Sequence, residues 1–145
     1  MSAKISKRLA EIVSALPLQR GMRVLEIGCG PGVAARAIAE ARDDIYVLAI
    51  DRSAKAIRQA KTGSTDLMAS GKLDFRKVDI ENFELESGEQ PFDLAFAVRV
   101  GALDGRHPER AKLALPKIAR ALTKKGQLYI DGGNPLKVID LNSYR

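Results

Sequence analysis

The sequence has few of the residues on which disulfide-bonded, zinc-binding and base-stacking proteins depend. Its 145 residues include one cysteine, one histidine and no tryptophan, and aromatic residues make up only 5%. The single cysteine, Cys29, can form no internal disulfide, so we expect a reducing, cytoplasmic location and no metal site. No apolar run approaches the roughly 20 residues that span a bilayer, and the first 16 residues lack the apolar core of a secretory signal. We therefore expect no membrane segment.

Charge is biased toward the basic side, with a formal net charge of +6. The excess lies late in the chain, because residues 106–125 hold seven Lys or Arg against one acidic residue, Glu109. Such a stretch is compatible with a nucleic-acid partner, but proteins that bind single strands usually add aromatic side chains for stacking. The scarcity of aromatics favours a solvated basic face instead.

Short runs of branched apolar residues alternate with amphipathic segments along the chain. The runs predict strands over residues 23–27, 45–50, 73–78, 92–98 and 127–130. The amphipathic segments predict helices over residues 3–16, 31–42, 53–61 and 108–125. This alternation predicts a single α/β domain, residues 1–145, with a doubly wound, mostly parallel sheet in a three-layer α/β/α arrangement.

Two segments fit this pattern poorly. Pro116 falls inside the last predicted helix, where proline removes a hydrogen-bond donor and clashes with the preceding turn, so we expect a break or a kink near Leu115. Residues 81–91 carry four carboxylates and no cation, which predicts a solvated connector with at most one helical turn.

The first predicted strand runs into a glycine-rich loop, with Gly28, Gly30 and Gly32 leading to a helix expected to begin at Pro31. Glycines at such a turn permit positive φ and let a ligand approach the backbone closely. A Walker phosphate loop is excluded because no lysine follows. A dinucleotide loop, and with it a nicotinamide-dependent oxidoreductase, is disfavoured because Val33 stands where the third glycine belongs.

The spacing E-x-G-x-G-x-G over residues 26–32 resembles the first motif of class I S-adenosylmethionine-dependent methyltransferases. The resemblance extends from residue 24 to residue 130, with an acidic residue, Asp51, ending the second strand and Asp79-Ile80 following the third. A carboxylate at Asp51 can accept hydrogen bonds from ribose hydroxyls, and one at Asp79 can accept from an adenine amino group. The resemblance implies that Glu26 faces the cationic end of S-adenosylmethionine. The cofactor contacts it implies are Glu26, Gly28, Cys29, Gly30, Gly32, Asp51, Arg52, Asp79, Ile80 and Ala97.

The methyl acceptor is not identified by any motif. Members of the resembled family that methylate exocyclic amino groups carry an Asn/Asp-Pro-Pro-aromatic signature after the fourth strand. The segment AVRVGALDGRHPER at this place lacks it, which argues against adenine-N6 and glutamine acceptors. Polar residues expected near this edge are Arg99, Asp104, His107, Asp131 and Asn134. His107 precedes Pro108 in a pattern typical of a helix start, and no catalytic residue is assigned.

The resembled family usually continues after its fifth strand with a helix and two more strands. Only residues 131–145 follow here, so we expect a C-terminally abbreviated sheet of five or six strands with an open edge. That edge could pair with a second copy or with a partner subunit. The resemblance leaves two functions open, an S-adenosylmethionine-dependent methyltransferase with an unknown acceptor, or a non-catalytic S-adenosylmethionine-binding partner subunit or sensor.

Overall fold

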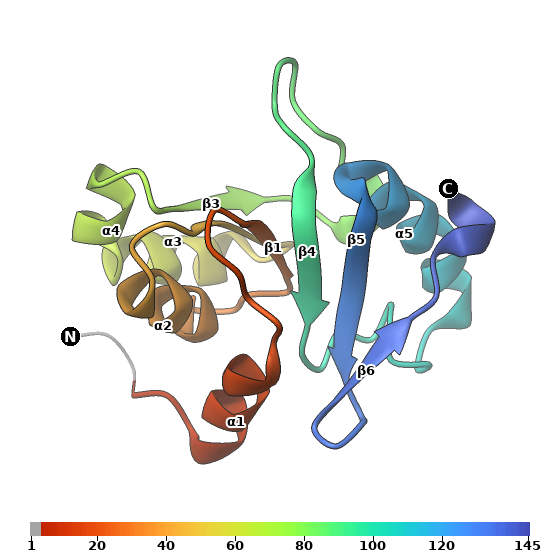
Figure 1. Cartoon of the computed structure of the whole chain (residues 1–145), viewed down its shortest axis with the longest axis horizontal. Helices are drawn as coiled ribbons and strands as arrows, with labels where there is room; N and C mark the ends of the chain where they lie inside the picture. Colours follow the sequence, from red (N-terminus) through yellow and green to blue (C-terminus); the bar gives the residue numbers. More distant parts are fainter. Residues whose placement is uncertain (1–3) are drawn as a thin grey trace.

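The computed structural model, which describes residues 4–145, contains one six-stranded sheet in the order β3-β2-β1-β4-β5-β6 (Figure 1). The strands are β1 (Arg23–Ile27), β2 (Tyr46–Asp51), β3 (Leu73–Lys77), β4 (Phe92–Ala97), β5 (Leu122–Asp131) and β6 (Leu136–Ile139). Neighbouring strands are parallel except for the antiparallel β5–β6 pair. The doubly wound, mostly parallel sheet is thus confirmed, with six strands.

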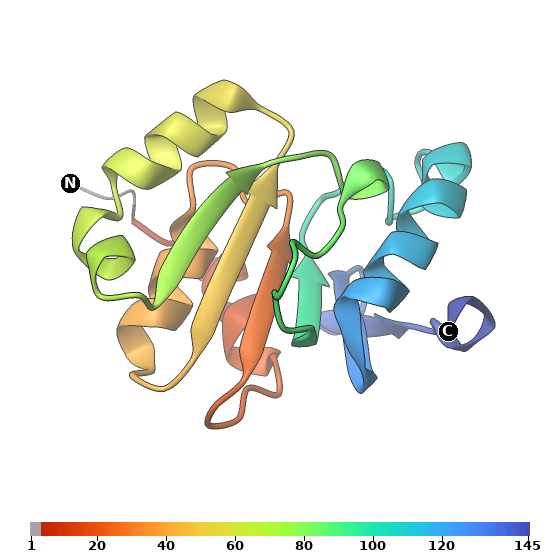
Figure 2. The ribbon, with the colours of Figure 1, turned by 90° about the horizontal axis from the view of Figure 1, so that it is seen from above.

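Helices cover both faces of this sheet. They are α1 (Lys7–Ala15), α2 (Val33–Ala41), α3 (Ala54–Thr62), α4 (Thr65–Ala69) and α5 (Pro108–Ala121), with short 3₁₀ turns η1 (Ile80–Asn82) and η2 (Asn142–Tyr144). Adjacent strand residues point to opposite faces, so Val24 packs with α1, α2 and α3, while Leu25 packs with α5 (Figure 2). The three-layer arrangement is confirmed.

The first helix is shorter than the predicted range 3–16, of which residue 3 lies outside the described residues. It begins at Lys7 because the Ser6 hydroxyl caps it, accepting a hydrogen bond from the Leu9 N–H at 3.1 Å. The second helix begins at Val33 rather than at Pro31, because Gly32 at its N-cap has a φ of +86°. The strand predictions agree to within one residue for β1 to β4, whereas β5 begins earlier, at Leu122, beyond a register shift against β4.

Of the break or kink predicted near Leu115, the break does not occur. α5 continues through Pro116 from Pro108 to Ala121. Proline removes the hydrogen bond to the carbonyl four residues earlier, which belongs to Lys112, an exposed residue where water can take its place. Ala114 and Ile118, on either side of the proline, are fully buried. Burial against the sheet therefore holds the helix together across the missing bond.

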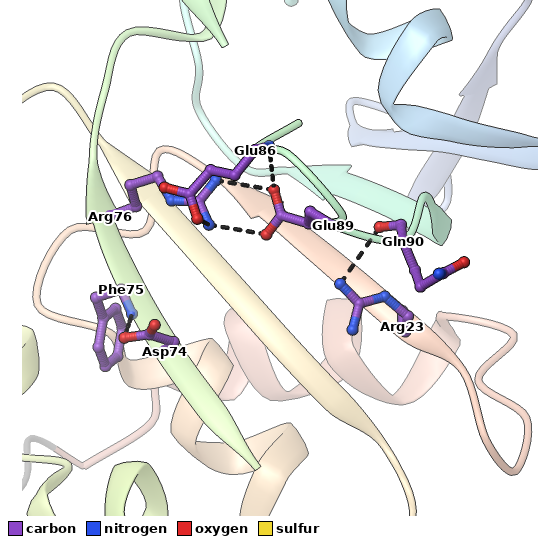
Figure 3. A network of polar contacts seen from close by, with 7 residues as sticks. All are labelled: Arg23, Asp74, Phe75, Arg76, Glu86, Glu89 and Gln90. Atoms are coloured by element: carbon purple, nitrogen blue, oxygen red, sulfur yellow. Dashed lines mark hydrogen bonds and ion pairs between the residues drawn. The ribbon is translucent and has the colours of Figure 1, made fainter. Parts of the chain in front are cut away.

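The connector 81–91 is mostly exposed and contains one short 3₁₀ turn, as predicted, but it is also anchored to other elements. Phe83 is 1% exposed, and Glu89 and Glu86 form ion pairs with Arg76 of β3, whose Nη2 lies 2.8 Å from Glu89 Oε2 and 3.2 Å from Glu86 Oε1 (Figure 3). A second cation, Lys117 of α5, pairs with Glu84 at 2.6 Å. The cations that neutralise this acidic segment come from other elements, so its own sequence does not reveal these pairs.

We expect the substitution Arg76→Met to lower the free energy of unfolding by about 1 kcal/mol, as is usual for a partly exposed, doubly paired guanidinium. Burial alone would raise the pKa of Glu89, but hydrogen bonds from Arg76 and from the Glu86 N–H outweigh it and lower that pKa. The stabilisation is therefore complete above the unfolded value of 4.5 and is lost as the pH falls below it. Urea denaturation at pH 7 and pH 3.5 measures both effects.

The matched control is Arg20→Met, because Arg20 pairs with Asp44 but its side chain is 93% exposed. It should change stability by less than about 0.5 kcal/mol. An Arg76→Met variant as stable as the Arg20→Met variant at pH 7 would show that the ion pairs do not hold the connector.

Candidate functional site

Two cavities open at the carboxyl ends of the parallel strands, the edge at which α/β sheets bind ligands. The first has a volume of about 230 Å³ and lies over the ends of β2 and β3. The second has a volume of about 380 Å³ and lies between α1 and the start of α2. Gly28 and Arg99 line both cavities. The two spaces therefore meet at the ends of β1 and β4.

The first cavity contains the acidic residues predicted at the ends of β2 and β3. Asp51, Arg52, Asp79 and Ile80 all line it. The Asp51 carboxylate accepts hydrogen bonds from the Gly30 N–H at 2.8 Å and from a second backbone N–H, that of residue 53, at 2.9 Å. Each of its oxygens keeps a further lone pair, so Asp51 can brace the glycine loop and still accept from a ligand.

The second cavity has apolar walls and one buried carboxylate. Leu9 and Ile12 of α1 form one wall, and Val33 and Val98 lie among the other lining residues. Glu26 lines the cavity at 4% exposure, and its Oε1 has no hydrogen-bond partner among residues 4–145.

This carboxylate has an unusual protonation equilibrium. Burial, with a smaller contribution from the charge of Asp51, raises the pKa of Glu26 to about 8, even though a backbone hydrogen bond and the charge of Arg36 act to lower it. An unpaired buried carboxyl group of this kind is suited to a cationic ligand, because a positive charge would restore the favourable environment that burial removed.

The three loop glycines have different roles. A Cβ on Gly28, whose φ is +72°, would lie 2.6 Å from Val100 Cγ2, so this glycine lets the turn after β4 approach the loop. A Cβ on Gly32 would lie 2.9 Å from the Phe75 ring, which makes that glycine a packing requirement between α2 and β3. Gly30 has open space at this position, and neither Gly30 nor Gly32 lines the two cavities.

The other two predicted contacts differ in position. Cys29 lines the second cavity, but burial raises the pKa of its thiol, which contacts the Gly30 carbonyl at 3.4 Å, so it is unsuited to act as a nucleophile. Ala97 packs in the core facing α5, and its neighbour Val98 lines the cavity in its place.

Of the polar residues considered for catalysis, Arg99 reaches the cavities and Asp131 contacts residues that do. The Arg99 N–H donates to Asp131 Oδ1 at 3.0 Å, and Arg8 Nη2 lies 3.5 Å from Asp131 Oδ2. Arg8, on α1, lines the second cavity and was missed by sequence reasoning. The only sequence signal for it was an amphipathic helix, which does not reveal where that helix docks.

The remaining candidates lie outside both cavities. Asp104 pairs with Arg106 at 2.8 Å. His107 is the N-cap residue of α5, with its imidazole 3.7 Å from Glu109, in agreement with its interpretation as a helix start. Asn134 lies in the turn between β5 and β6, beside α1.

Within the described part of the chain, no helix is both long and apolar enough to cross a membrane. No group of three or more His, Cys, Asp or Glu side chains among residues 4–145 is arranged to hold a metal ion.

Comparisons with known proteins agree with this geometry. Residues 18–142 match the family model described as "Methyltransferase domain". The chain is 30% identical to an O-methyltransferase of Pyrenophora dematioidea over 83% of its own length and 42% of that protein. It is 27% identical to the O-methyltransferase rstn1 of Aspergillus nomiae over 91% of its own length and 56% of that protein. The chain thus spans about half the length of the curated relatives it matches.

A solved structure supports the same relationship. The S-adenosylmethionine-dependent methyltransferase of Geobacter sulfurreducens, solved with S-adenosyl-L-homocysteine, is 25% identical with a TM-score of 0.66, covering 87% of this chain and 47% of that one. The matched family model spans the glycine loop, both cavity-lining aspartates and the whole sheet, so the chain belongs to the methyltransferase-domain family, among the class I S-adenosylmethionine-dependent methyltransferases.

Proposed function

We propose that this chain binds S-adenosylmethionine and transfers its methyl group to a hydroxyl oxygen of an acceptor molecule. The observation that carries the proposal is the pair of cavities that meet at Gly28 and Arg99, one lined by Asp51 and Asp79 and the other by the unpaired carboxyl group of Glu26. The names of the two curated relatives, both O-methyltransferases, support oxygen as the acceptor atom.

The residues present fit the cofactor at both ends. Asp51 would accept hydrogen bonds from the ribose hydroxyls, and Asp79 from the adenine amino group, with Ile80 as an apolar wall for the ring. Arg52 would lie beside the adenine. Glu26 would face the ammonium and sulfonium charges, which explains why a carboxyl group whose Oε1 has no hydrogen-bond partner among the described residues is buried there.

Methyl transfer from the cofactor requires mainly that the protein position the acceptor oxygen against the methyl group. When bound, the cofactor supplies an electrophilic methyl group on a leaving group that needs no activation. The apolar walls of the second cavity exclude water and hold the acceptor, and Glu26 is the one carboxylate in its lining. Positioning of this kind can provide most of the rate enhancement of an in-line displacement.

The proposal also covers the extent of the domain, its location in the cell and its partners. Residues 1–145 form one domain that acts in the cytoplasm, and β6, as the edge strand, offers the surface for a second copy or a partner subunit, with Val138 48% exposed. The acceptor is a small molecule, a protein or an RNA, and the proposal does not depend on which.

We expect S-adenosyl-L-homocysteine to raise the melting temperature of the protein in a concentration-dependent way, because a ligand that binds only the folded state stabilises it. NAD should give no shift. The Asp51→Asn variant should bind S-adenosyl-L-homocysteine about 10- to 100-fold more weakly, since it loses a charge-assisted acceptor. The control is Asp43→Asn, a carboxylate that is 97% exposed and lies outside both cavities.

Two outcomes decide between the functions left open. No stabilisation of the wild-type protein by S-adenosyl-L-homocysteine would contradict both cofactor-dependent functions. If it binds, incubation with S-adenosylmethionine carrying a labelled methyl group and fractionated cell extract separates them. Label transferred to an extract component supports the methyltransferase, and binding without transfer supports a sensor or partner subunit.

A further inference from the structure

Arg99 has a backbone conformation that is rare for a residue with a side chain. Its φ is +58°, and it is the one non-glycine residue with positive φ in the described part of the chain. A left-handed conformation costs an arginine about 1 to 2 kcal/mol, and strain of this kind persists only where the surroundings impose it. The surroundings of Arg99 therefore impose this conformation on its backbone.

Two charged residues hold this backbone from opposite sides. The Asp131 carboxylate accepts from the Arg99 N–H at 3.0 Å, and Arg106 Nη2 donates to the Arg99 carbonyl at 3.0 Å. Arg106 is fixed in turn by Asp104, which its Nε contacts at 2.9 Å. Backbone and charge together fix where the Arg99 side chain leaves the end of β4.

Arg99 lines both cavities, and its exposed side chain forms no hydrogen bond or ion pair with residues 4–145. The second cavity has one further arginine, Arg8, whose side chain is 59% exposed and whose contact with Asp131 is long at 3.5 Å. Glu26 is the one carboxylate among the residues that line this cavity, and Asp131 pairs with Arg8 from outside the lining. Arg99 is therefore the cation of the second cavity that no carboxylate among residues 4–145 pairs with.

We propose that Arg99 binds a carboxylate in the second cavity and that Asp131 is the residue that positions it. The planar guanidinium matches a carboxylate through two parallel hydrogen bonds, which a fixed backbone makes more selective. The carboxylate belongs either to the amino-acid end of the cofactor or to an acidic group on the acceptor. This inference rests on the proposed function, and it assigns Arg99 a role in specificity rather than in a proton-transfer step.

The variant Arg99→Gly separates this role from a structural one. Glycine adopts a φ near +58° without strain, so the variant should melt at or above the wild-type temperature while losing the guanidinium. The exposed Arg120→Ala on α5 is the matched control for removal of one positive charge.

Calorimetry then measures two matched pairs of probes. The first pair is S-adenosyl-L-homocysteine and 5′-methylthioadenosine, which lacks the amino-acid end. The second pair is 4-hydroxybenzoate and 4-hydroxybenzamide, titrated into protein saturated with S-adenosyl-L-homocysteine. We expect Arg99→Gly to weaken the carboxylate member of one pair about 10- to 100-fold and to leave the other member unchanged.

A loss confined to the first pair would assign the carboxylate to the cofactor, and a loss confined to the second pair would assign it to the acceptor. Unchanged affinity for all four probes in Arg99→Gly overturns the inference while leaving cofactor binding intact. If neither S-adenosyl-L-homocysteine nor 5′-methylthioadenosine binds the wild-type protein, the proposed function fails and the inference fails with it.

The positioning role of Asp131 has its own test. Asp131→Ala should weaken the same probe as Arg99→Gly, and the double variant should be no weaker than Arg99→Gly alone, because Asp131 acts through Arg99. Asp131→Asn, whose amide oxygen still accepts from the Arg99 N–H, should recover most of the affinity. Additive losses in the double variant would contradict this coupling.

Discussion

Replacing Glu26 by glutamine should make the protein more stable and less able to bind its cofactor. The folded wild-type carboxyl group keeps its proton up to a pKa of about 8, whereas the unfolded chain releases it near 4.5. The folded state thus binds more protons between these values, and the free energy of unfolding falls as the pH rises through this range. At about 1.4 kcal/mol per pH unit, the loss reaches about 5 kcal/mol above pH 8.

The glutamine variant has no such titration. Its stability should exceed that of the wild type by a margin that grows by about 3 kcal/mol between pH 4.5 and pH 7, and by about 5 kcal/mol up to pH 8. Urea denaturation across this range measures the margin. Glu40→Gln, an exposed carboxylate on α2, is the control and should change the pH profile little.

Cofactor binding should respond in the opposite sense. A bound ammonium group favours the charged form of Glu26, so the wild type should release a proton on binding S-adenosyl-L-homocysteine at pH 7 and should bind it more tightly as the pH rises toward 8. Glu26→Gln should lose about 2 to 4 kcal/mol of binding free energy and this pH dependence. Calorimetry in buffers of different ionisation enthalpy would count the protons, and equal proton release by both proteins would contradict this role.

Replacing Arg36 by methionine should lower the free energy of unfolding by about 3 kcal/mol. Arg36 is 4% exposed, and its Nη1 donates to the Pro31 carbonyl at 2.9 Å, to the Ser64 hydroxyl at 3.0 Å and to the Ala60 carbonyl at 3.4 Å. These acceptors join the glycine loop to the C-terminal end of α3, where carbonyl dipoles favour a cation. Methionine fills a similar volume but leaves the Pro31 carbonyl without this donor.

The control for Arg36 is Arg42→Met at the end of the same helix, where the side chain is exposed and a change below about 0.5 kcal/mol is expected. Urea denaturation at pH 7 compares the two. If Arg36→Met were as stable as the wild type, the cost of burying an arginine with no carboxylate contact would equal what its hydrogen bonds contribute.

Features set by short segments of sequence were predictable. The strands β1 to β4 follow from local runs of branched residues, and the positions of Asp51 and Asp79 follow because each comes at or just after the end of a parallel strand. The order and direction of these strands bring both side chains to one cavity. The cofactor half of the site could therefore be proposed before the fold was known.

Features that depend on contacts between distant segments were not predictable. The strain at Arg99 depends on Asp131, which lies 32 residues later, and Arg8 reaches the cavity only because α1 docks over the start of α2. The same reason applies to the connector, where Arg76 supplies the positive charge that the local sequence lacks. The periodicity of apolar residues and the spacing of motifs give no information on these contacts between distant residues.

The four residues that α1 and its cap contribute to the second cavity, Ser6, Arg8, Leu9 and Ile12, have no counterpart in the first. Under the proposed function, strand ends in the sheet would bind the nucleoside half of the ligand, whereas one short helix beside the β5–β6 turn would supply part of the wall around the acceptor. Binding of the nucleoside and selection of the acceptor would therefore depend on different elements of the fold. Changes in α1 could redirect this protein to a new acceptor in evolution or by design, while the binding of the methyl donor stays intact.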